Sequence, residues 1–133
     1  MGDKSDSRSR KWMITINNPP YKGFTHDKIK EVLTSIRSLD YWAMCDEIGN
    51  EKHTLHTHII IHRGGALRFS TLQKMFPPGS QLDNLRGTMQ QARDYIRKEG
   101  KYKGSSKEET NLKNTFEESG MVPDERQGQR SDL

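Results

Sequence analysis

The sequence lacks the features that hold a chain in a membrane or cross-link it outside the cell. Its 133 residues include one cysteine, Cys45, so no disulfide can form within the chain, which is typical of a reducing compartment. The longest run of aliphatic side chains is Ile59-Ile60-Ile61, whereas a membrane-spanning helix needs about 20 apolar residues. The opening residues are polar and contain no apolar core, unlike a secretory signal. We therefore expect a soluble intracellular protein with no membrane partner.

Apolar side chains are also scarce, at 30% of the chain, and they are unevenly distributed. Nearly all of the large ones fall within residues 12–102, where we expect a single folded domain. Residues 1–11 predict a flexible basic arm, and residues 103–133 predict a polar linker. The net charge is +4, and the positive excess lies in the first 99 residues.

Two hydrophobic periods alternate within residues 12–102. Alternating apolar and polar side chains predict strands at residues 11–17, 41–47, 55–62 and 81–85. Spacings of three and four predict a helix capped by Thr25 with an apolar stripe to Leu39, a short helix capped by Ser70, and a helix from Thr88 to Glu99 that Gly100 ends. This order predicts an α+β fold, an antiparallel sheet of about five strands with helices packed on it.

The strongest chemical signal is His56-Thr57-His58 in the third predicted strand. Side chains two residues apart project from one face of a strand, so both imidazoles can reach one point. Glu47 ends the preceding strand, and a hairpin would return it beside the histidines. Two imidazoles, one carboxylate and open water positions suit Mn²⁺ or Mg²⁺, although a pair of half-exposed histidines without a ligand is the alternative. His62 lies about 13 Å beyond His58 at the rise of a strand, too far for the same ion, and we interpret it as structural or DNA-facing.

Tyr95 and Lys98 form a second signal in the last predicted helix. Residues three apart share a helix face, so the phenol and the ammonium would be neighbours. A tyrosine hydroxyl is a weak nucleophile until a neighbouring group activates it, and an ammonium can do so. By itself the same spacing is more typical of an amphipathic surface helix.

The third signal is WMITINNP, which begins at Trp12. A predicted strand leads directly into Asn17-Asn18-Pro19, side chains rich in hydrogen-bond donors and acceptors. By itself the segment is typical of a turn that follows a strand.

Together, WMITINNP, LHTHIII and YIRKEGKY resemble, in this order, the three motifs of the HUH endonuclease domain in replication initiator (Rep) proteins of circular single-stranded-DNA viruses, and the circovirus group is the most similar. The resemblance covers residues 10–104. The closing QGQRSDL resembles the segment that leads toward the helicase domain of such proteins. One departure is His-Thr-His, where circovirus-type members commonly have His-hydrophobic-Gln. The second histidine makes the site softer and favours Mn²⁺ or even Zn²⁺.

The resemblance implies a metal-dependent enzyme that nicks single-stranded DNA at a viral origin stem-loop. It would form a 5′-phosphotyrosine, rejoin strands and start rolling-circle replication in the host nucleus. A helicase domain would follow in the same full-length chain, and the protein could act as a homo-oligomer. The implied site residues are the nucleophile Tyr95 with its helper Lys98, the metal ligands Glu47, His56 and His58, and the DNA contacts Arg10, Lys11, Thr15, Asn17 and Asn18.

Three other functions stay open. An RRM-like module that binds single-stranded nucleic acid without cleaving it would keep the fold and charge but leave the histidines and Tyr95 without a role. A transposase or relaxase of the same endonuclease class is the second, although relaxases usually place the tyrosine before the histidines. A metallohydrolase would attack with an activated water and would not need Tyr95.

Overall fold

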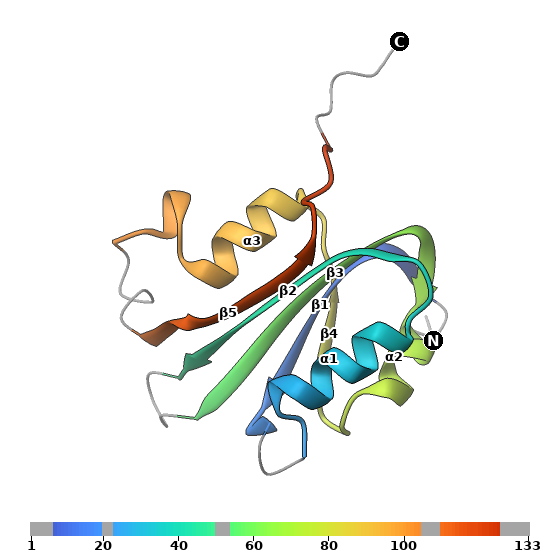
Figure 1. Cartoon of the computed structure of the whole chain (residues 1–133), viewed down its shortest axis with the longest axis horizontal. Helices are drawn as coiled ribbons and strands as arrows, with labels where there is room; N and C mark the ends of the chain where they lie inside the picture. Colours follow the sequence, from blue (N-terminus) through green and yellow to red (C-terminus); the bar gives the residue numbers. More distant parts are fainter. Residues whose placement is uncertain (1–6, 20–22, 50–53, 105–109, 126–133) are drawn as a thin grey trace.

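The computed structural model describes residues 7–19, 23–49, 54–104 and 110–125. In these ranges the chain forms a five-stranded antiparallel sheet with three α-helices packed on it (Figure 1), which confirms the predicted α+β class. The strands are β1 (Arg8–Asn17), β2 (Leu39–Ile48), β3 (Leu55–Arg68), β4 (Gln81–Asn84) and β5 (Asn111–Gly120). The helices are α1 (His26–Ser35), α2 (Phe69–Met75) and α3 (Met89–Arg97), and a short 3-10 turn, η3 (Gly100–Tyr102), follows α3.

The strand order across the sheet is β4-β1-β3-β2-β5, so β3 lies at the centre between β1 and β2. All four pairs of neighbouring strands are antiparallel. The register places His56 opposite Glu47 of β2 on one side and opposite Asn17 of β1 on the other. His58 lies opposite Thr15. Because directly opposed residues project from the same face, these side chains gather at one end of one face.

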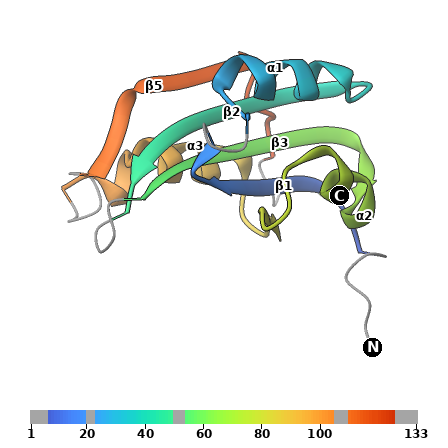
Figure 2. The ribbon, with the colours of Figure 1, turned by 90° about the horizontal axis from the view of Figure 1, so that it is seen from below.

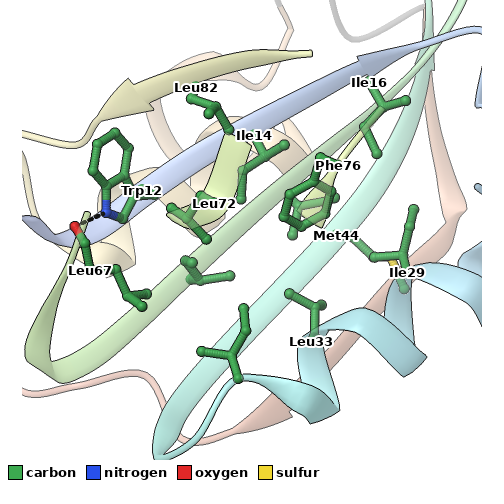
Figure 3. Packing of buried hydrophobic residues seen from close by; sticks show 13 residues of the cluster. Trp12, Ile14, Ile16, Ile29, Leu33, Met44, Leu67, Leu72, Phe76 and Leu82 are labelled. Carbon is green, nitrogen blue, oxygen red and sulfur yellow. Dashed lines mark hydrogen bonds between the residues drawn. The ribbon is translucent and has the colours of Figure 1, made fainter. Parts of the chain in front are cut away.

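Helices cover both faces of the sheet, which gives the molecule two cores. Figure 2 shows α1 and α3 on opposite sides of the strands. The larger core lies under α1 and α2, and Figure 3 shows how its side chains interlock. At its edge the buried Trp12 indole N–H donates to the carbonyl oxygen of Leu67 at 3.3 Å. The smaller core lies under α3 and contains Tyr41, Ala43, Cys45, Ile60, Met89, Ala92 and Ile96.

Local sequence explains where α3 begins, and the backbone explains where it ends. Thr88 caps the helix through a reciprocal capping box with Gln91, as the sequence predicts. The helix stops at Arg97, two residues before the predicted end at Glu99. Lys98 adopts a left-handed conformation (φ 54°, ψ 46°) that cannot continue a right-handed helix.

The first two helices also differ from the prediction at one end. The helix α1 begins after Thr25, as expected, but ends at Ser35, because Ser38 has a φ of 65° and turns the chain into β2. Leu39 therefore starts a strand instead of completing the helical stripe. Ser70 lies inside α2, which begins at Phe69 without a side-chain cap. None of the helices in the described ranges is long and apolar enough to cross a membrane.

The folded unit extends beyond residues 12–102 on both sides. The strand β1 begins at Arg8, so residues 8–11 of the predicted arm belong to the sheet, while residues 1–6 lie outside the described ranges. Residues 111–120 of the predicted linker form the edge strand β5. This strand was not predicted because its sequence, NLKNTFEESG, has few apolar residues and no regular alternation. Its pairing with β2 stabilises a strand that the sequence pattern does not favour.

Candidate active site

The two histidines of β3 are held by side chains of the neighbouring strand β1. His56 Nδ1 lies 2.6 Å from Asn17 Oδ1, and His58 Nδ1 lies 3.1 Å from Thr15 Oγ1. An amide oxygen only accepts, so His56 donates its Nδ1 proton and keeps a lone pair on Nε2. The two imidazole rings are 6.3 Å apart. Both rings are thus oriented through Nδ1, which leaves each Nε2 for another partner.

Thr15 and Asn17 therefore have a role that the resemblance did not imply, because in the structure they bond to the imidazoles. That they also contact or orient DNA stays a prediction. Partners of this kind fix the tautomer and the orientation of metal-binding histidines in proteins. The signal was present in the sequence, because the alternation of β1 puts Thr15 and Asn17 on one face. Only the register of β1 with β3 shows which histidine each one meets.

Glu47 lies beside the histidines, where the hairpin argument expects it. Its Oε1 atom is 3.7 Å from His58 Nε2 and 3.1 Å from the Lys98 ammonium. The same oxygen is buried and accepts no hydrogen bond among the described residues. The Lys98 ammonium balances the charge of this carboxylate, and a bound cation would add a direct contact to the oxygen.

Lys98 is fully buried beneath Tyr95. Its ammonium lies 3.7 Å from the centroid of the Tyr95 ring and donates a hydrogen bond to the Tyr95 carbonyl oxygen at 2.9 Å. The left-handed backbone at Lys98 turns the side chain back under the last turn of α3. The side chain is 0% exposed. The resemblance implied that Lys98 helps the nucleophile Tyr95, and that role stays a prediction.

Tyr95 faces the histidines from α3. Its ring centroid is 6.1 Å from that of His58, in an edge-to-face arrangement. Tyr95 also lines a cavity of about 310 Å³ together with Met13, Leu85 and Gln91. The helix and the sheet therefore bring an alcohol, two imidazoles, a carboxylate and an ammonium together.

The electrostatic surroundings favour the neutral form of His58. Burial is the largest cause, and the positive Lys98 and a neighbouring His56 add to it, so the pKa of His58 falls to about 4. The negative charge of Glu47 raises the pKa of His58, but this effect is smaller than the lowering by burial. Near neutral pH the imidazole is thus uncharged, which is the form that binds metals.

Two of the other three implied DNA contacts, Arg10 and Lys11, lie apart from this cluster. Lys11 pairs with Glu125 at 2.9 Å and donates to the Gly87 carbonyl oxygen at 2.6 Å. Arg10 is exposed near the start of β1. Asn18 is exposed at the end of β1 with a φ of 51°, and its N–H donates to the Leu55 carbonyl oxygen at 2.8 Å. Of these three, Asn18 is the residue next to the histidine end of the sheet.

The remaining histidines of the described ranges make carboxylate contacts elsewhere. His62 Nδ1 lies 2.6 Å from Asp40 Oδ1, which agrees with a structural role. His26, at the start of α1, lies between Asp46 at 2.8 Å and Glu117 at 2.7 Å. Sequence reasoning missed His26, because its partners come from distant parts of the chain and no local pattern joins them.

The candidate metal ligands Glu47, His56 and His58 are not arranged as a complete set. Across the described ranges, no group of three or more His, Cys, Asp or Glu side chains is placed to hold a metal ion. Glu47 contacts His58 and Lys98, and the two imidazoles are oriented but 6.3 Å apart. The donor set still fits a divalent cation, since it offers two imidazole nitrogens and a carboxylate oxygen that lacks a donor.

Protein-family models were searched and none matches this sequence. No curated protein matches it either.

Proposed function

We propose that this protein is a metal-dependent HUH endonuclease that cuts single-stranded DNA with Tyr95 as its nucleophile and can rejoin the strand. The observation that carries the proposal is the position of Tyr95, whose ring lies 6.1 Å from that of His58 on the face that also carries Glu47 and His56. A surface tyrosine of an amphipathic helix would have no reason to meet a buried, neutral imidazole.

The cleavage step is a transfer of the phosphoryl group to Tyr95. The tyrosine oxygen bonds to phosphorus as the bond to the 3′ oxygen breaks, which leaves a 5′-phosphotyrosine and a 3′ hydroxyl. The phenol proton is released and the departing 3′ oxygen takes up a proton. The energy of the phosphodiester is retained in the new bond, so a 3′ hydroxyl can reverse the step and join strands without ATP.

The residues around Tyr95 have separate tasks in this reaction. Lys98 places a positive charge under the Tyr95 ring and beside Glu47, where it would offset negative charge that develops on the attacking group. Thr15 and Asn17 hold His58 and His56 in fixed orientations. The cavity beside Tyr95 is wide enough at about 310 Å³ to receive a nucleobase next to the scissile phosphate.

Glu47, His56 and His58 would hold the divalent cation, Mn²⁺ or Mg²⁺. When bound, the cation supplies Lewis-acid polarisation of the scissile phosphate.

The biological setting follows from the sequence motifs. The substrate would be a stem-loop in the replication origin of a circular single-stranded-DNA virus, and the free 3′ hydroxyl would prime rolling-circle synthesis. The helicase domain of the same full-length chain and a second copy of the protein would be its partners, and the host nucleus its location.

The test is the formation of a covalent adduct. A labelled single-stranded origin sequence is incubated with the protein and Mn²⁺, and the products are separated under denaturing conditions. We expect an adduct with the wild type and none with Tyr95→Phe, which retains the ring but not the hydroxyl. Replacing Glu47, His56 or His58 by Ala should abolish cleavage while DNA binding largely persists.

Other outcomes would favour the alternatives. Binding without any adduct would favour the RRM-like module. Cleavage that survives Tyr95→Phe would favour a metallohydrolase that uses water. Loss of binding in proportion to loss of cleavage in the Glu47, His56 and His58 variants would count against a metal role.

A further inference from the structure

The chain that follows β5 returns to the start of α3, the helix that carries Tyr95. Figure 1 shows this red segment beside the yellow start of the helix. Val122 is half-buried and packs against the smaller core under α3. Glu125 lies next to Met89, the first residue of the helix. We call residues 121–125 the strap, because they connect the end of the sheet to the beginning of this helix.

Both carboxylate oxygens of Glu125 accept hydrogen bonds. Oε1 accepts from the Lys11 ammonium at 2.9 Å, and Oε2 accepts from the Met89 N–H at 2.6 Å. The side chains of Lys11 and Glu125 are 21% and 18% exposed, so solvent reaches the pair. A lysine ammonium and an N–H group at the start of a helix bind phosphate oxygens in the same way. Glu125 therefore lies where a phosphate group would find two donors.

Lys11 lies at the edge of the cavity that Tyr95 lines. Its ammonium also donates to the Gly87 carbonyl oxygen at 2.6 Å, and Gly87 is one of the residues around this cavity. Lys11, Met13 and Thr15 alternate along β1, so they share the face of the sheet that carries the candidate site. A single strand that leaves Tyr95 through the cavity would therefore arrive at Lys11, about 13 Å along β1 from Thr15.

The strap is held more weakly than the strands of the sheet. Val122 is the strap residue that packs against a hydrophobic core, whereas Met121 is 85% exposed. An ion pair that solvent reaches contributes little to stability. A tethered carboxylate nevertheless competes at a high effective concentration, which a free anion has to exceed. An anion that binds Lys11 can thus displace the strap without unfolding the sheet, but at a cost in its own affinity.

We propose that the strap is an autoinhibitory contact, in which Glu125 takes the place of a DNA phosphate at Lys11. This inference rests on the proposed function, because the competing anion is the single strand that Tyr95 attacks. While the strap is bound, the charge of Lys11 is neutralised. When the strand displaces the carboxylate, Lys11 binds a phosphate and the strap is released. Because coupling is reciprocal, a partner that binds the released strap would raise the affinity for DNA.

The test measures binding of the labelled single-stranded origin sequence in the Tyr95→Phe background, in which no adduct can form. Glu125→Gln removes the charge and retains the shape of the side chain. We expect it to raise the affinity about fivefold near physiological salt, the upper end of what a partly exposed ion pair contributes. The dependence of log affinity on log salt should become steeper by about 0.7, since an unpaired lysine adds one phosphate contact. A Glu125 that only caps the helix would give no such rise.

A double variant separates the release of Lys11 from a general effect of charge. Lys11→Gln should weaken binding less than about twofold while Glu125 is present, and about fivefold in the Glu125→Gln background. The matched control is Glu31→Gln on α1, whose carboxylate pairs with Lys28 at 3.2 Å. It removes the same charge from a helix on the opposite side of the sheet from α3 (Figure 2). The affinity and the salt dependence of this control should match those of the parent.

A second variant, Val122→Thr, tests the strap without altering its charge. The added hydroxyl weakens the contact with the smaller core, so the strap should be released more easily and the affinity should rise. This variant also provides the comparison if Glu125→Gln does not fold. In the protein with Val122 intact, the NMR signals of its methyl groups should move toward those of an exposed valine when the oligonucleotide binds.

Four results would overturn the proposal. The first is an unchanged or lower affinity in both Glu125→Gln and Val122→Thr, and the second is strict additivity of Lys11→Gln and Glu125→Gln. The third is an equal rise in Glu31→Gln, which would indicate a general effect of charge. The fourth is a Val122 signal that does not move when DNA binds. Failure of the proposed function would appear separately, as an oligonucleotide that binds but forms no adduct in the protein with Tyr95 intact.

Discussion

Lys98 combines a left-handed backbone with a fully buried ammonium, and each feature depends on the other. A lysine in this conformation is uncommon, and here it ends α3 and directs the side chain toward Glu47 and Tyr95. Burial of an unpaired charge would be prohibitive, so Glu47 is needed by Lys98 as much as Lys98 by Glu47. At the scale of single residues, the site therefore depends on a contact between Lys98 and Glu47, which are far apart in the sequence.

Replacing only one of Lys98 and Glu47 should lower the free energy of unfolding more than replacing both. We expect Lys98→Met to lower the free energy of unfolding by about 3 kcal/mol, because it leaves the Glu47 carboxylate buried without a counter-charge. Glu47→Gln in the same chain should recover part of that loss. Urea denaturation of the two single variants and the double variant measures the interaction. Strictly additive effects would contradict a coupled pair.

The hydroxyl of Thr15 should matter for metal binding more than for stability. Thr15→Val keeps the shape of the side chain but removes the hydrogen-bond partner of His58 Nδ1. We expect a 10- to 100-fold loss in Mn²⁺ affinity, the usual effect of losing such a partner, measured by calorimetric titration. Thr15→Ser should restore affinity. An equal loss of affinity in Thr15→Ser, or a Thr15→Val variant that binds Mn²⁺ normally, would show that the hydroxyl does not position the ring.

At the scale of elements, β5 connects the sheet to α3. Arg93 of α3 makes two hydrogen bonds to Glu118 of β5, at 2.9 and 3.0 Å. Asn111 at the start of β5 donates to the carbonyl oxygen of Ile96 at 2.8 Å, near the end of α3. Phe116 lies under the guanidinium groups of Arg93 and Arg97. The helix that carries Tyr95 is thus fixed from a segment whose composition suggests a linker.

A chain that ends at Gly104 should therefore be less stable than one that ends at Glu125. We expect the free energy of unfolding to fall by more than about 3 kcal/mol, because the hydrogen bonds between β2 and β5 and the Arg93–Glu118 pair are lost together. Urea denaturation followed by circular dichroism measures the difference. A milder variant, Arg93→Gln, should lower the free energy of unfolding by about 1 kcal/mol. This variant tests the same contact if the shorter chain does not fold. Equal stability of the two chains would mean that β5 is dispensable.

At the scale of the whole molecule, His26 joins three elements that are remote in sequence. Its ring links the start of α1 to Asp46 of β2 and to Glu117 of β5. Thr57 of β3 donates to the same Asp46 oxygen at 2.8 Å. The hydrogen bond to Asp46 is the largest cause that raises the pKa of His26 above 6.5, burial opposes it, and Glu117 adds to the rise.

The raised pKa gives a prediction for stability against pH. The folded state binds the His26 proton more tightly than the unfolded state, so the stabilisation is fully present below about pH 6.5 and is lost as the pH rises through the higher folded value. We expect His26→Gln to lower the free energy of unfolding by about 1 kcal/mol more at pH 6 than at pH 9. Chemical denaturation at the two pH values measures this difference. The same loss at both values would contradict a charged His26 in the fold.

Local sequence determined much of this protein. Alternation in β1 and β3 put Thr15, His56 and His58 on one face, because successive strand residues point to opposite sides. Thr88 and its capping box determined where α3 begins. The short spacing between Glu47 and His56 determined a hairpin that returns the carboxylate. These features depend on neighbours in the chain, and a pattern of residue types is enough to specify them.

Only the tertiary structure decided what these groups meet. The partners of the imidazoles depend on the register of β1 against β3, and the charge partner of Lys98 depends on how α3 crosses the sheet. The strand β5 forms because β2 offers an unpaired edge to a polar segment, and Arg8 meets Arg68 only across a strand pair. Such contacts join residues that are far apart in the sequence, so no local sequence pattern predicts them.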